Sequence, residues 1–403
     1  MLFKRKIEVS RDEALVEDFL TRGVAAQYPD KEKVRSMFMK GERLSMYFGI
    51  DPTGPTLHLG HAIALRKMRA FQNLGHRVIL LIGSFTAQIG DPTDKLATRV
   101  MLTEAQVLEN AKLYKKQAST IINFGGNNPA ELMYNGDWLS RLSFKDTIEL
   151  AAKTTVQEML KRDMFETRIK EEKPIYVHEF LYPLMQGYDS VAMKVDGEIG
   201  GNDQLFSMLV GRDLVRAYLN KEKFVLTVKL LTDTTGKKMG KSEGNMASLS
   251  DTPEDMFGKV MSWTDGMISS GFELCTDVAT SELSSIERRL QTENPRDIKL
   301  ELAFEVVKAH FGEENAVRAK EHFTKTFSQK EMPDEVMQVR VADIQTMRDF
   351  VAKVAGVSNS QATRLFEQGA VKTEAGEKMT DPAAPPKKGK YKIGSRQFGE
   401  IVE

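Results

Sequence analysis

The sequence of 403 residues contains a single cysteine, Cys275. One thiol cannot form a disulfide within the chain, and zinc sites built from cysteine need several thiolates. The sequence therefore excludes an internal disulfide and argues against a cysteine-based zinc site. We expect no zinc or other metal ion held by the protein's own side chains.

Long apolar runs are also missing. The longest, such as residues 78–82, have the length of a strand and are too short to cross a bilayer. Residues 1–6 are followed by mixed charged sequence without the apolar core of a secretory signal. With 41% hydrophobic and 28% charged residues, the composition is that of a soluble globular protein. We therefore expect a cytoplasmic protein with no membrane partner.

The chain has no net charge, because its 57 Lys and Arg residues balance its 57 Asp and Glu residues. Proteins that bind nucleic acid through bulk electrostatics carry a positive excess. Any contact with RNA must therefore come from a local basic cluster.

The first half of the chain shows the periodicities of an α/β fold. Residues 44–50 read as a strand, 58–74 as a helix ended by Gly75, and 77–82 as a buried strand. Such a βαβ unit predicts a parallel sheet.

Further segments fit the same plan. Thr103 and Gln106 form a capping box, which predicts a helix that runs to about residue 123. Strands are expected at 131–134, 197–200 and 224–231, and helices at 144–170, 178–190 and 203–219. The mixed charge of the helical region at about 125–175 suits an insertion that packs on the sheet edge or on a partner subunit.

Strand signals stop near residue 246, and amphipathic helix predominates over 253–330. The last part of the chain combines helix and strand signals again, with a helix at 360–368 and strands at 370–373 and 391–393. The expected domains are 1–245, 246–335 and 341–403.

Two histidines flank a glycine at the start of the first helix. His58 and His61 share one helix face, and the helix N-terminus offers free N–H groups and the positive end of the dipole. Gly60 lets a nucleotide approach the backbone, and imidazoles can stabilise charge that develops on phosphate oxygens. The motif predicts a nucleotide-phosphate site. The alternatives are ordinary surface histidines and, less favoured, a zinc site, for which no third ligand lies nearby.

A loop rich in glycine and lysine follows the last predicted strand of the sheet and contains Lys238, Lys241 and Ser242. Such loops hold phosphates. A Walker A loop is not favoured, because Gly236 and Gly240 are separated by three residues, one fewer than that motif has. A solvated charged loop is the remaining alternative. Together with the histidines, the loop points to chemistry at the α-phosphate of ATP.

With both motifs identified, the sequence resembles the class I aminoacyl-tRNA synthetases, whose two signatures match residues 52–61 and 238–242. The resemblance is closer to the bacterial tyrosyl-tRNA synthetases, whose motifs occur in the same order at 47–53, 89–92, 182–189 and 200–204. It implies a Rossmann-like parallel-sheet catalytic domain, followed by an α-helical domain of the anticodon-binding type and a small α+β domain like the S4 RNA-binding fold. It also implies a homodimer.

The resemblance assigns roles to the matching residues. Tyr47 and Asp189 would bind the phenolic hydroxyl of L-tyrosine, and Asp91, Tyr182 and Gln186 its ammonium group. The full tyrosine site would be Tyr47, Asp91, Tyr182, Gln186, Asp189, Asp203 and Gln204. ATP would contact Asp51, Thr53, His58, Gly60, His61, Lys238 and Lys241, and the catalytic residues would be His58, His61, Lys238, Lys241 and Ser242. Glu198 stands where many bacterial relatives have Gln, and we assign it no substrate role.

The implied reaction activates tyrosine with ATP, accompanied by Mg²⁺, and transfers the tyrosyl group to tRNA(Tyr). Three alternatives remain open. A tryptophanyl enzyme shares the fold, but a phenol suits the Tyr47 and Asp189 pair better than an indole N–H, which needs only an acceptor. A small-molecule adenylyltransferase would not need the last 150 or so residues. A non-catalytic RNA-binding descendant would be expected to lose the histidines or lysines.

A local basic cluster near the C-terminus surrounds one aromatic residue. It consists of Lys387, Lys388, Lys390, Tyr391, Lys392 and Arg396. Basic side chains suit RNA phosphates and an aromatic ring suits base stacking, so these residues are the predicted RNA contacts. A solvated basic tail is the alternative.

Overall fold

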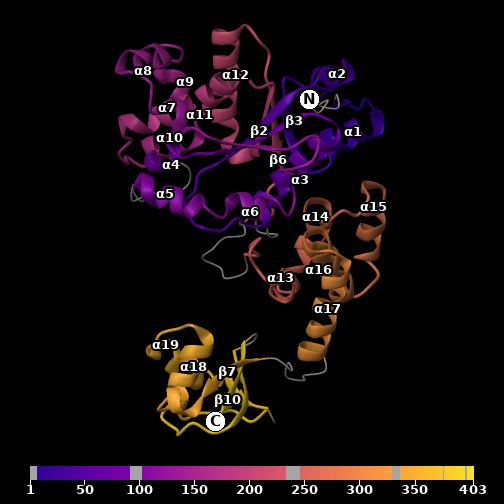
Figure 1. The fold of residues 1–403 in the computed structure, drawn as a ribbon, viewed down its shortest axis with the longest axis vertical. Coiled ribbons are helices and arrows are strands. Elements are labelled where there is room, and N and C mark those ends of the chain that lie inside the picture. Colours follow the sequence, from indigo (N-terminus) through magenta and orange to yellow (C-terminus); the bar gives the residue numbers. More distant parts are fainter. Residues whose placement is uncertain (1–6, 91–101, 233–245, 329–335, 375, 395–396) are drawn as a thin grey trace, which may run out of the picture. The chain divides into compact units, whose positions relative to one another are not determined.

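The computed structural model describes residues 7–90, 102–232, 246–328, 336–374, 376–394 and 397–403. The chain divides into two compact units, Met1–Ala316 and Val317–Glu403 (Figure 1). Among the described residues, no helix combines the length and apolar character that a membrane span requires.

A six-stranded sheet forms the centre of the first unit, in the order β1-β6-β5-β2-β3-β4 (Figure 1). Its strands are β1 Val24–Tyr28, β2 Ser45–Ile50, β3 Arg77–Ile82, β4 Glu131–Tyr134, β5 Gly197–Gly201 and β6 Phe224–Val228. Strands β2 to β6 all run parallel to one another, and β1 pairs antiparallel with β6 at the edge of the sheet. The predicted parallel sheet is confirmed. Periodicity does not predict β1, because its side chains are only partly buried.

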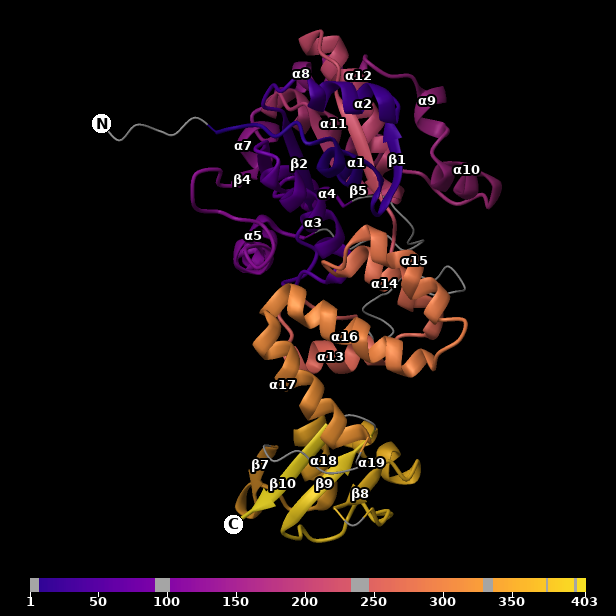
Figure 2. The ribbon, with the colours of Figure 1, turned by 90° about the vertical axis from the view of Figure 1, so that its right-hand side faces the viewer.

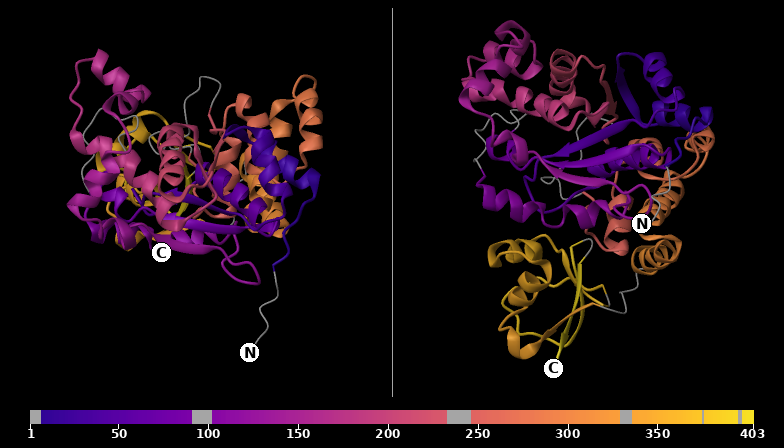
Figure 3. Two further views of the ribbon diagram at one scale, coloured as in Figure 1. Left: turned by 90° about the horizontal axis from the view of Figure 1, so that it is seen from above. Right: turned by 45° about the horizontal axis from the view of Figure 1, so that its top comes forward.

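Helices cover both faces of this sheet (Figures 2 and 3). They are α1 Glu13–Thr21, α2 Lys31–Met39, α3 Leu59–Asn73, α4 Thr86–Ile89, α5 Glu104–Ala111, α6 Tyr114–Ala118, α7 Gly136–Leu139, α8 Phe144–Ala151, α9 Val156–Leu160, α10 Asp163–Lys170, α11 Val177–Met193 and α12 Leu205–Leu219. From β2 to β3 the chain moves along the sheet in one direction, and from β4 through β5 to β6 it moves in the other. Because both connections are right-handed, α3 lies on one face of the sheet, and α11 and α12 lie on the other. The strand order therefore reverses between β2 and β5.

Two predicted helices are interrupted. The helix expected over 103–123 ends at Ala111 and resumes as α6, because Tyr114 and Gln117 turn toward the loop before α3. The Tyr114 hydroxyl donates to the Gly54 carbonyl at 2.6 Å, and the Gln117 side chain accepts the Leu57 N–H at 2.6 Å.

The helix expected over 144–170 is also divided, into α8, α9 and α10. A second capping box causes the break between α8 and α9. The Thr155 side chain accepts the Glu158 N–H, while the Glu158 carboxylate accepts the Thr155 N–H at 2.8 Å. Such a box begins a new helix rather than continuing the old one.

The predicted helical stretch after residue 246 is present. It contains α13 Pro253–Met261, α14 Ile268–Cys275, α15 Thr280–Arg289, α16 Pro295–Phe311 and α17 Glu313–Phe323. The first four helices belong to the same compact unit as the sheet. Arg22, just after α1, donates to the carbonyls of Phe272, Glu273, Thr276 and Val278 around the end of α14. The predicted division at residue 246 stays a prediction.

The second unit has a four-stranded sheet in the order β7-β10-β9-β8, with two helices (Figure 2). Its elements are β7 Met337–Arg340, α18 Met347–Ala355, α19 Asn359–Glu367, β8 Val371–Thr373, β9 Gly389–Ile393 and β10 Gln397–Val402. Phe350, Phe366 and Ile401 lie in its core. The expected α+β character is confirmed, and β7, α18 and β10 are additions to the predicted elements.

Candidate active site

A pocket lies at the carboxyl ends of β2 and β5, where the strand order reverses. Open parallel sheets bind ligands at such switch points. Every described residue that the sequence predicted for tyrosine or ATP lines this pocket: Tyr47, Asp51, Thr53, His58, Gly60, His61, Tyr182, Gln186, Asp189, Asp203 and Gln204. Asp91, Lys238, Lys241 and Ser242 lie outside the described residues.

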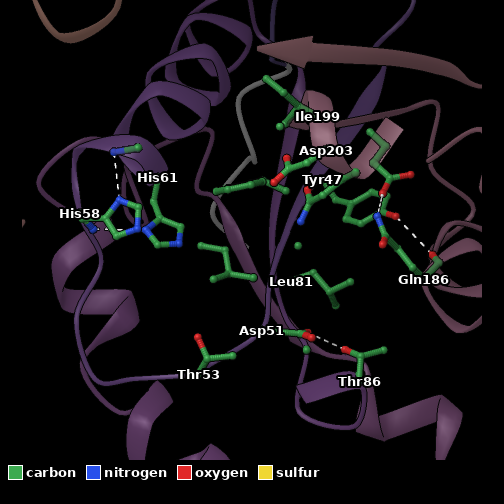
Figure 4. Close-up of a pocket in the computed structure, with 18 of the residues that line it drawn as sticks. Tyr47, Asp51, Thr53, His58, His61, Leu81, Thr86, Gln186, Ile199 and Asp203 are labelled. Atoms are coloured by element: carbon green, nitrogen blue, oxygen red, sulfur yellow. Dashed lines mark hydrogen bonds between the residues drawn. The ribbon is translucent and has the colours of Figure 1, made fainter. Parts of the chain in front are cut away.

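The two ends of the pocket differ in chemistry. Figure 4 shows His58 and His61 side by side at one end, and Tyr47 and Gln186 at the other. Asp51 lies between them, close to Thr86.

The histidine end is built by helix capping. His58 is the N-cap of α3, and its Nδ1 accepts the Gly60 N–H at 3.1 Å. In return, Nδ1 of His61 accepts the His58 N–H at 3.2 Å. Since both Nδ1 atoms are acceptors, each neutral ring carries its proton on Nε2 and can donate it there.

Gly60 is required by the His58 ring as well as by an approaching ligand. A Cβ atom at position 60 would lie 2.8 Å from Cε1 and 2.9 Å from Nδ1 of His58. Any larger residue would displace the imidazole from its cap. The sequence motif predicted only the role in close approach of a nucleotide.

The segment that follows the lysine-rich loop is fixed beside the histidines. The Leu59 N–H donates to the Ala247 carbonyl at 3.0 Å, and the Leu249 N–H donates to the Leu57 carbonyl at 2.9 Å. His58 and Ser248 thereby form an antiparallel bridge. The fold therefore anchors residues 247–249 at the start of α3.

The Asp51 carboxylate is held by two hydroxyl groups. Thr86 Oγ1 donates to Oδ1 at 2.6 Å, and the Tyr182 hydroxyl donates to Oδ2 at 2.8 Å. A Cβ atom on Gly83 would lie 1.8 Å from Oδ1, so only glycine fits there. Asp51 and Tyr182, which the sequence assigns to ATP and to tyrosine, are thus direct neighbours.

Asp189 is 2% exposed at the opposite end of the pocket. Its Oδ1 accepts the Trp138 indole N–H at 2.7 Å, and its Oδ2 accepts the Asn135 side-chain N–H at 3.2 Å. Burial raises the pKa of the Asp189 carboxyl well above its usual range, although both N–H donors act in the opposite direction. Each oxygen keeps a lone pair with which it can accept a hydrogen bond from a ligand.

Tyr47 reaches the same end from β2. It is 1% exposed, and its hydroxyl lies 3.1 Å from Ser190 Oγ. Burial raises the pKa of this hydroxyl well above its usual range, with Glu198 and Asp189 adding to the effect, so the group stays protonated. Tyr47 therefore offers an O–H donor, and Asp189, whose two oxygens already accept N–H groups, offers an acceptor.

Sequence reasoning missed Trp138, Asn135 and Glu198 as parts of this site. Asn135 directly follows β4, a position that is common for site residues in parallel sheets. Trp138 is one of only two tryptophans, but nothing in its spacing indicates that it would reach Asp189. Among the described residues, no group of three or more His, Cys, Asp or Glu side chains is arranged to hold a metal ion.

The basic cluster of the second unit lies on β9 and the turn before it, and Arg396 lies outside the described residues. The prediction for Tyr391 is wrong. Its ring is 3% exposed, contacts Phe350, and its hydroxyl donates to the Lys387 carbonyl at 2.7 Å. Strand alternation points Tyr391 into the core, so it cannot stack on a base.

The chain matches known proteins over most of its length. Residues 39–328 match the family model described as tRNA synthetases class I (W and Y). A tyrosine–tRNA ligase of Thermotoga maritima is 44% identical over 389 residues, with 95% of this chain and 96% of that protein covered. One of Moorella thermoacetica is 42% identical, with 94% and 92% covered.

Solved structures share the fold at low sequence identity. A C-terminally truncated mitochondrial tyrosyl-tRNA synthetase of Aspergillus nidulans has a TM-score of 0.66 and 22% identity, covering 78% of this chain and 94% of that chain. The tyrosyl-tRNA synthetase of Archaeoglobus fulgidus, complexed with L-tyrosine, has a TM-score of 0.61 and 21% identity, covering 77% and 100%. This chain therefore belongs to the class I tRNA synthetases for tryptophan and tyrosine, and within them to the tyrosine–tRNA ligase family.

Proposed function

We propose that this chain activates L-tyrosine with ATP and then transfers the tyrosyl group to the 3′ end of tRNA(Tyr) in the cytoplasm. The observation that carries the proposal is the pocket itself. It joins a helix N-terminus with two imidazole donors to a buried donor and acceptor pair, Tyr47 and Asp189.

The Tyr47 and Asp189 end suits a phenol. A phenolic hydroxyl donates one hydrogen bond and accepts another, and these two side chains supply both partners. An indole N–H would leave the Tyr47 hydroxyl with only the Gln186 main-chain carbonyl at 3.5 Å as acceptor, a long contact that satisfies a buried donor poorly. For the ammonium group of the substrate we propose Tyr182, Gln186 and Asp91. Asp203 and Gln204 would complete the tyrosine site from the end of β5.

The His58 and His61 end suits the phosphates of ATP. The Nε2–H groups and the N-terminus of α3 provide donors, and their alignment with the helix dipole favours negative charge. Asp51, Thr53 and Gly60 would lie beside the nucleotide. Lys238, Lys241 and Ser242 would approach from the loop whose following segment is anchored at Leu59.

The first step needs no side-chain nucleophile. A carboxylate oxygen of tyrosine attacks the α-phosphorus, the P–O bond to the β-phosphate breaks, and pyrophosphate leaves. Mg²⁺ bound to ATP would neutralise part of the phosphate charge. In the second step, a ribose hydroxyl of the tRNA attacks the carbonyl carbon of tyrosyl-adenylate, loses its proton, and AMP leaves. The protein contributes by positioning the reactants and stabilising charge at phosphorus.

We also propose a homodimer. Large apolar side chains are exposed on α8, α9, α10 and the start of α11, and exposed apolar side chains are candidates for a subunit interface. They are Phe144 at 82%, Ile148 at 54%, Val156 at 64%, Ile169 at 51% and Val177 at 78% exposure. A second copy of the chain is the partner that the sequence prediction for the insertion favours.

Amino-acid-dependent exchange between ATP and pyrophosphate tests the proposed activity. Tyrosine, phenylalanine and tryptophan are compared in parallel, and we expect exchange with tyrosine alone. Exchange driven by tryptophan would reassign the substrate, and no exchange with any of the three would contradict the activity. Charging of tRNA(Tyr) with labelled tyrosine then tests the second step.

A further inference from the structure

An ion pair lies buried directly beneath the tyrosine end of the pocket. Glu198 on β5 is 2% exposed, and Lys223, just before β6, is completely buried. Removing two charges from water costs several kcal/mol per ion unless additional hydrogen bonds satisfy them. A pair placed here therefore needs an explanation beyond stability.

The Lys223 ammonium has three acceptors. Its Nζ donates to Glu198 Oε2, to Ser190 Oγ at 2.7 Å, and to the Met208 carbonyl at 3.4 Å. Burial lowers the pKa of Lys223, while Glu198 acts in the opposite direction. Since an ammonium has three N–H donors and no acceptor, this arrangement satisfies it completely.

Two glycines make room for this ammonium. Gly187 on α11 and Gly211 on α12 face each other, and a Cβ atom at Gly211 would lie 2.7 Å from Lys223 Nζ. A Cβ atom at Gly187 would lie 3.1 Å from the Gly211 backbone. The close approach of these helices thus builds the pocket in which Lys223 ends.

Lys223 fixes the direction of the hydrogen bonds that end at Tyr47. Because Ser190 Oγ accepts from Lys223, its own proton must go to another atom. The Tyr47 hydroxyl lies at 3.1 Å and Glu198 Oε2 at 3.5 Å, so Tyr47 is the nearer acceptor. A Tyr47 hydroxyl that accepts from Ser190 keeps its own proton to donate. Without substrate its acceptor is the Gln186 main-chain carbonyl at 3.5 Å, a long contact that a phenolic oxygen in the pocket can replace.

Glu198 fixes the orientation of Gln186 in the same way. Its Oε1 accepts a hydrogen bond from Gln186 Nε2 at 2.9 Å. An amide whose nitrogen donates to a carboxylate turns its oxygen away from that carboxylate. Gln186, which lines the pocket, is thereby held as an acceptor.

We propose that the Glu198–Lys223 pair is a positioning device that sets the hydrogen-bond polarity of the tyrosine site. Through Ser190, Lys223 makes Tyr47 a donor to the phenolic oxygen of the substrate. Through Gln186, Glu198 presents a carbonyl oxygen to the substrate's ammonium group. The proposal rests on tyrosine as the substrate and names the residues that determine its selection over phenylalanine.

The double variant Glu198→Gln, Lys223→Met tests the proposal, because it replaces both charges by neutral side chains of similar size. Each single variant leaves one buried charge unpaired and should lower Tm, and the double variant should recover most of that loss. We expect the double variant to raise the KM for tyrosine at least about tenfold while the KM for ATP changes less than about twofold. Its preference for tyrosine over phenylalanine should fall by a similar factor.

Lys221→Met is the matched control. Lys221 lies in the same loop before β6 as Lys223, and its Nζ pairs with Asp196 Oδ1 at 2.7 Å. Asp196 does not line the pocket, so this variant should keep both KM values. Ser190→Ala is a milder probe, because it removes the hydroxyl between Lys223 and Tyr47 and keeps the ion pair. It should lower the preference for tyrosine over phenylalanine. Its Tm should fall less than that of either single charge variant, because Lys223 loses only one of its three acceptors.

The outcomes separate the two proposals. If the natural protein shows no exchange with tyrosine, the proposed function fails whatever the variants do. If it exchanges and the Ser190→Ala and double variants keep the natural KM and selectivity, the positioning role is wrong while the proposed function stands. A tyrosine-specific loss in both variants supports the positioning role.

Discussion

His58 and His61 orient each other at the start of α3. The backbone N–H of His58 donates to Nδ1 of His61 at 3.2 Å, and the two ring centroids lie 4.0 Å apart. The same side chains therefore cap the helix and point their Nε2 atoms away from the cap. Helix capping depends on Nδ1, and the proposed phosphate binding would depend on Nε2, so mutations can separate the two.

His58→Asn and His58→Ala should separate these roles. Asparagine can cap a helix but lacks the reach of Nε2–H, whereas alanine provides neither function. We expect His58→Ala to lose about 1 kcal/mol of stability and His58→Asn to lose little. Both should slow adenylate formation about a hundredfold, with the KM for tyrosine nearly unchanged. Denaturation curves and exchange kinetics give both quantities, and a fully active His58→Asn would show that Nε2 does not act on the phosphates.

Tyr47→Phe should reduce the preference for tyrosine over phenylalanine. The substitution removes only the hydroxyl, so the affinity for tyrosine should fall about tenfold, as expected for one lost buried hydrogen bond. Phenylalanine should be activated as well as before or better. Competitive exchange measurements give the ratio directly.

Tyr114→Phe is the matched control for that experiment. The Tyr114 hydroxyl donates to the Gly54 carbonyl at 2.6 Å, and Tyr114 does not line the pocket. This variant should lose about 1 kcal/mol of stability and keep its selectivity. Equal losses of selectivity in both variants would argue against a direct contact between Tyr47 and the substrate.

The sequence predicted the position of the pocket because its motifs follow strands that periodicity identifies well. Asp51 directly follows β2, and Asp203 and Gln204 follow β5. Parallel strands bring such ends together at one edge of the sheet. The position of His58 was predicted equally well, because the sequence indicates both the loop before it and the helix after it.

The residues that sequence reasoning missed depend on tertiary placement. Lys223 is one of two lysines in a short loop and looks like any solvent-exposed charge, yet it is buried because Gly187 and Gly211 leave space for it. The prediction that Tyr391 contacts RNA was wrong for the opposite reason. Its neighbours are basic, but strand alternation turns its ring into the core.

The second unit should contribute to tRNA charging and not to adenylate formation. We expect the quadruple variant of Lys387, Lys388, Lys390 and Lys392 to Gln to lower the efficiency of tyrosylation about tenfold or more at physiological salt, since each lost phosphate contact weakens RNA binding. Exchange between ATP and pyrophosphate should be unchanged. Deletion of residues 341–403 should have the same effect in a stronger form, and intact charging by that truncated chain would contradict an RNA role.

Phe144→Asp should dissociate the proposed homodimer. A charge in the centre of an apolar interface is desolvated without a partner, which costs several kcal/mol. Sedimentation or light scattering should show a dimer for the natural chain and a monomer for the variant. Leu15→Asp is the control, because Leu15 is 56% exposed on α1 and lies outside helices α8 to α11. A natural chain that is already monomeric would contradict the dimer.

His310→Leu should make the protein less sensitive to acid. His310 lies 9% exposed within α16, and neither ring nitrogen has a hydrogen-bond partner among the described residues. Burial lowers the pKa of His310 from 6.5 to about 4, with Arg66 adding to the effect. Between these two values the unfolded chain binds a proton that the folded chain does not, so stability is lost as the pH falls from about 6.5 to about 4.

The shift corresponds to about 3 kcal/mol at the acid end of this window, and His310→Leu should abolish that share of the loss. His76, whose pKa burial also lowers to about 4, should account for part of the slope that remains. Both tryptophans, Trp138 and Trp263, lie in the first unit, so their fluorescence during urea unfolding reports on it. Equal slopes against pH for the natural chain and the variant would show that His310 is protonated in the folded state.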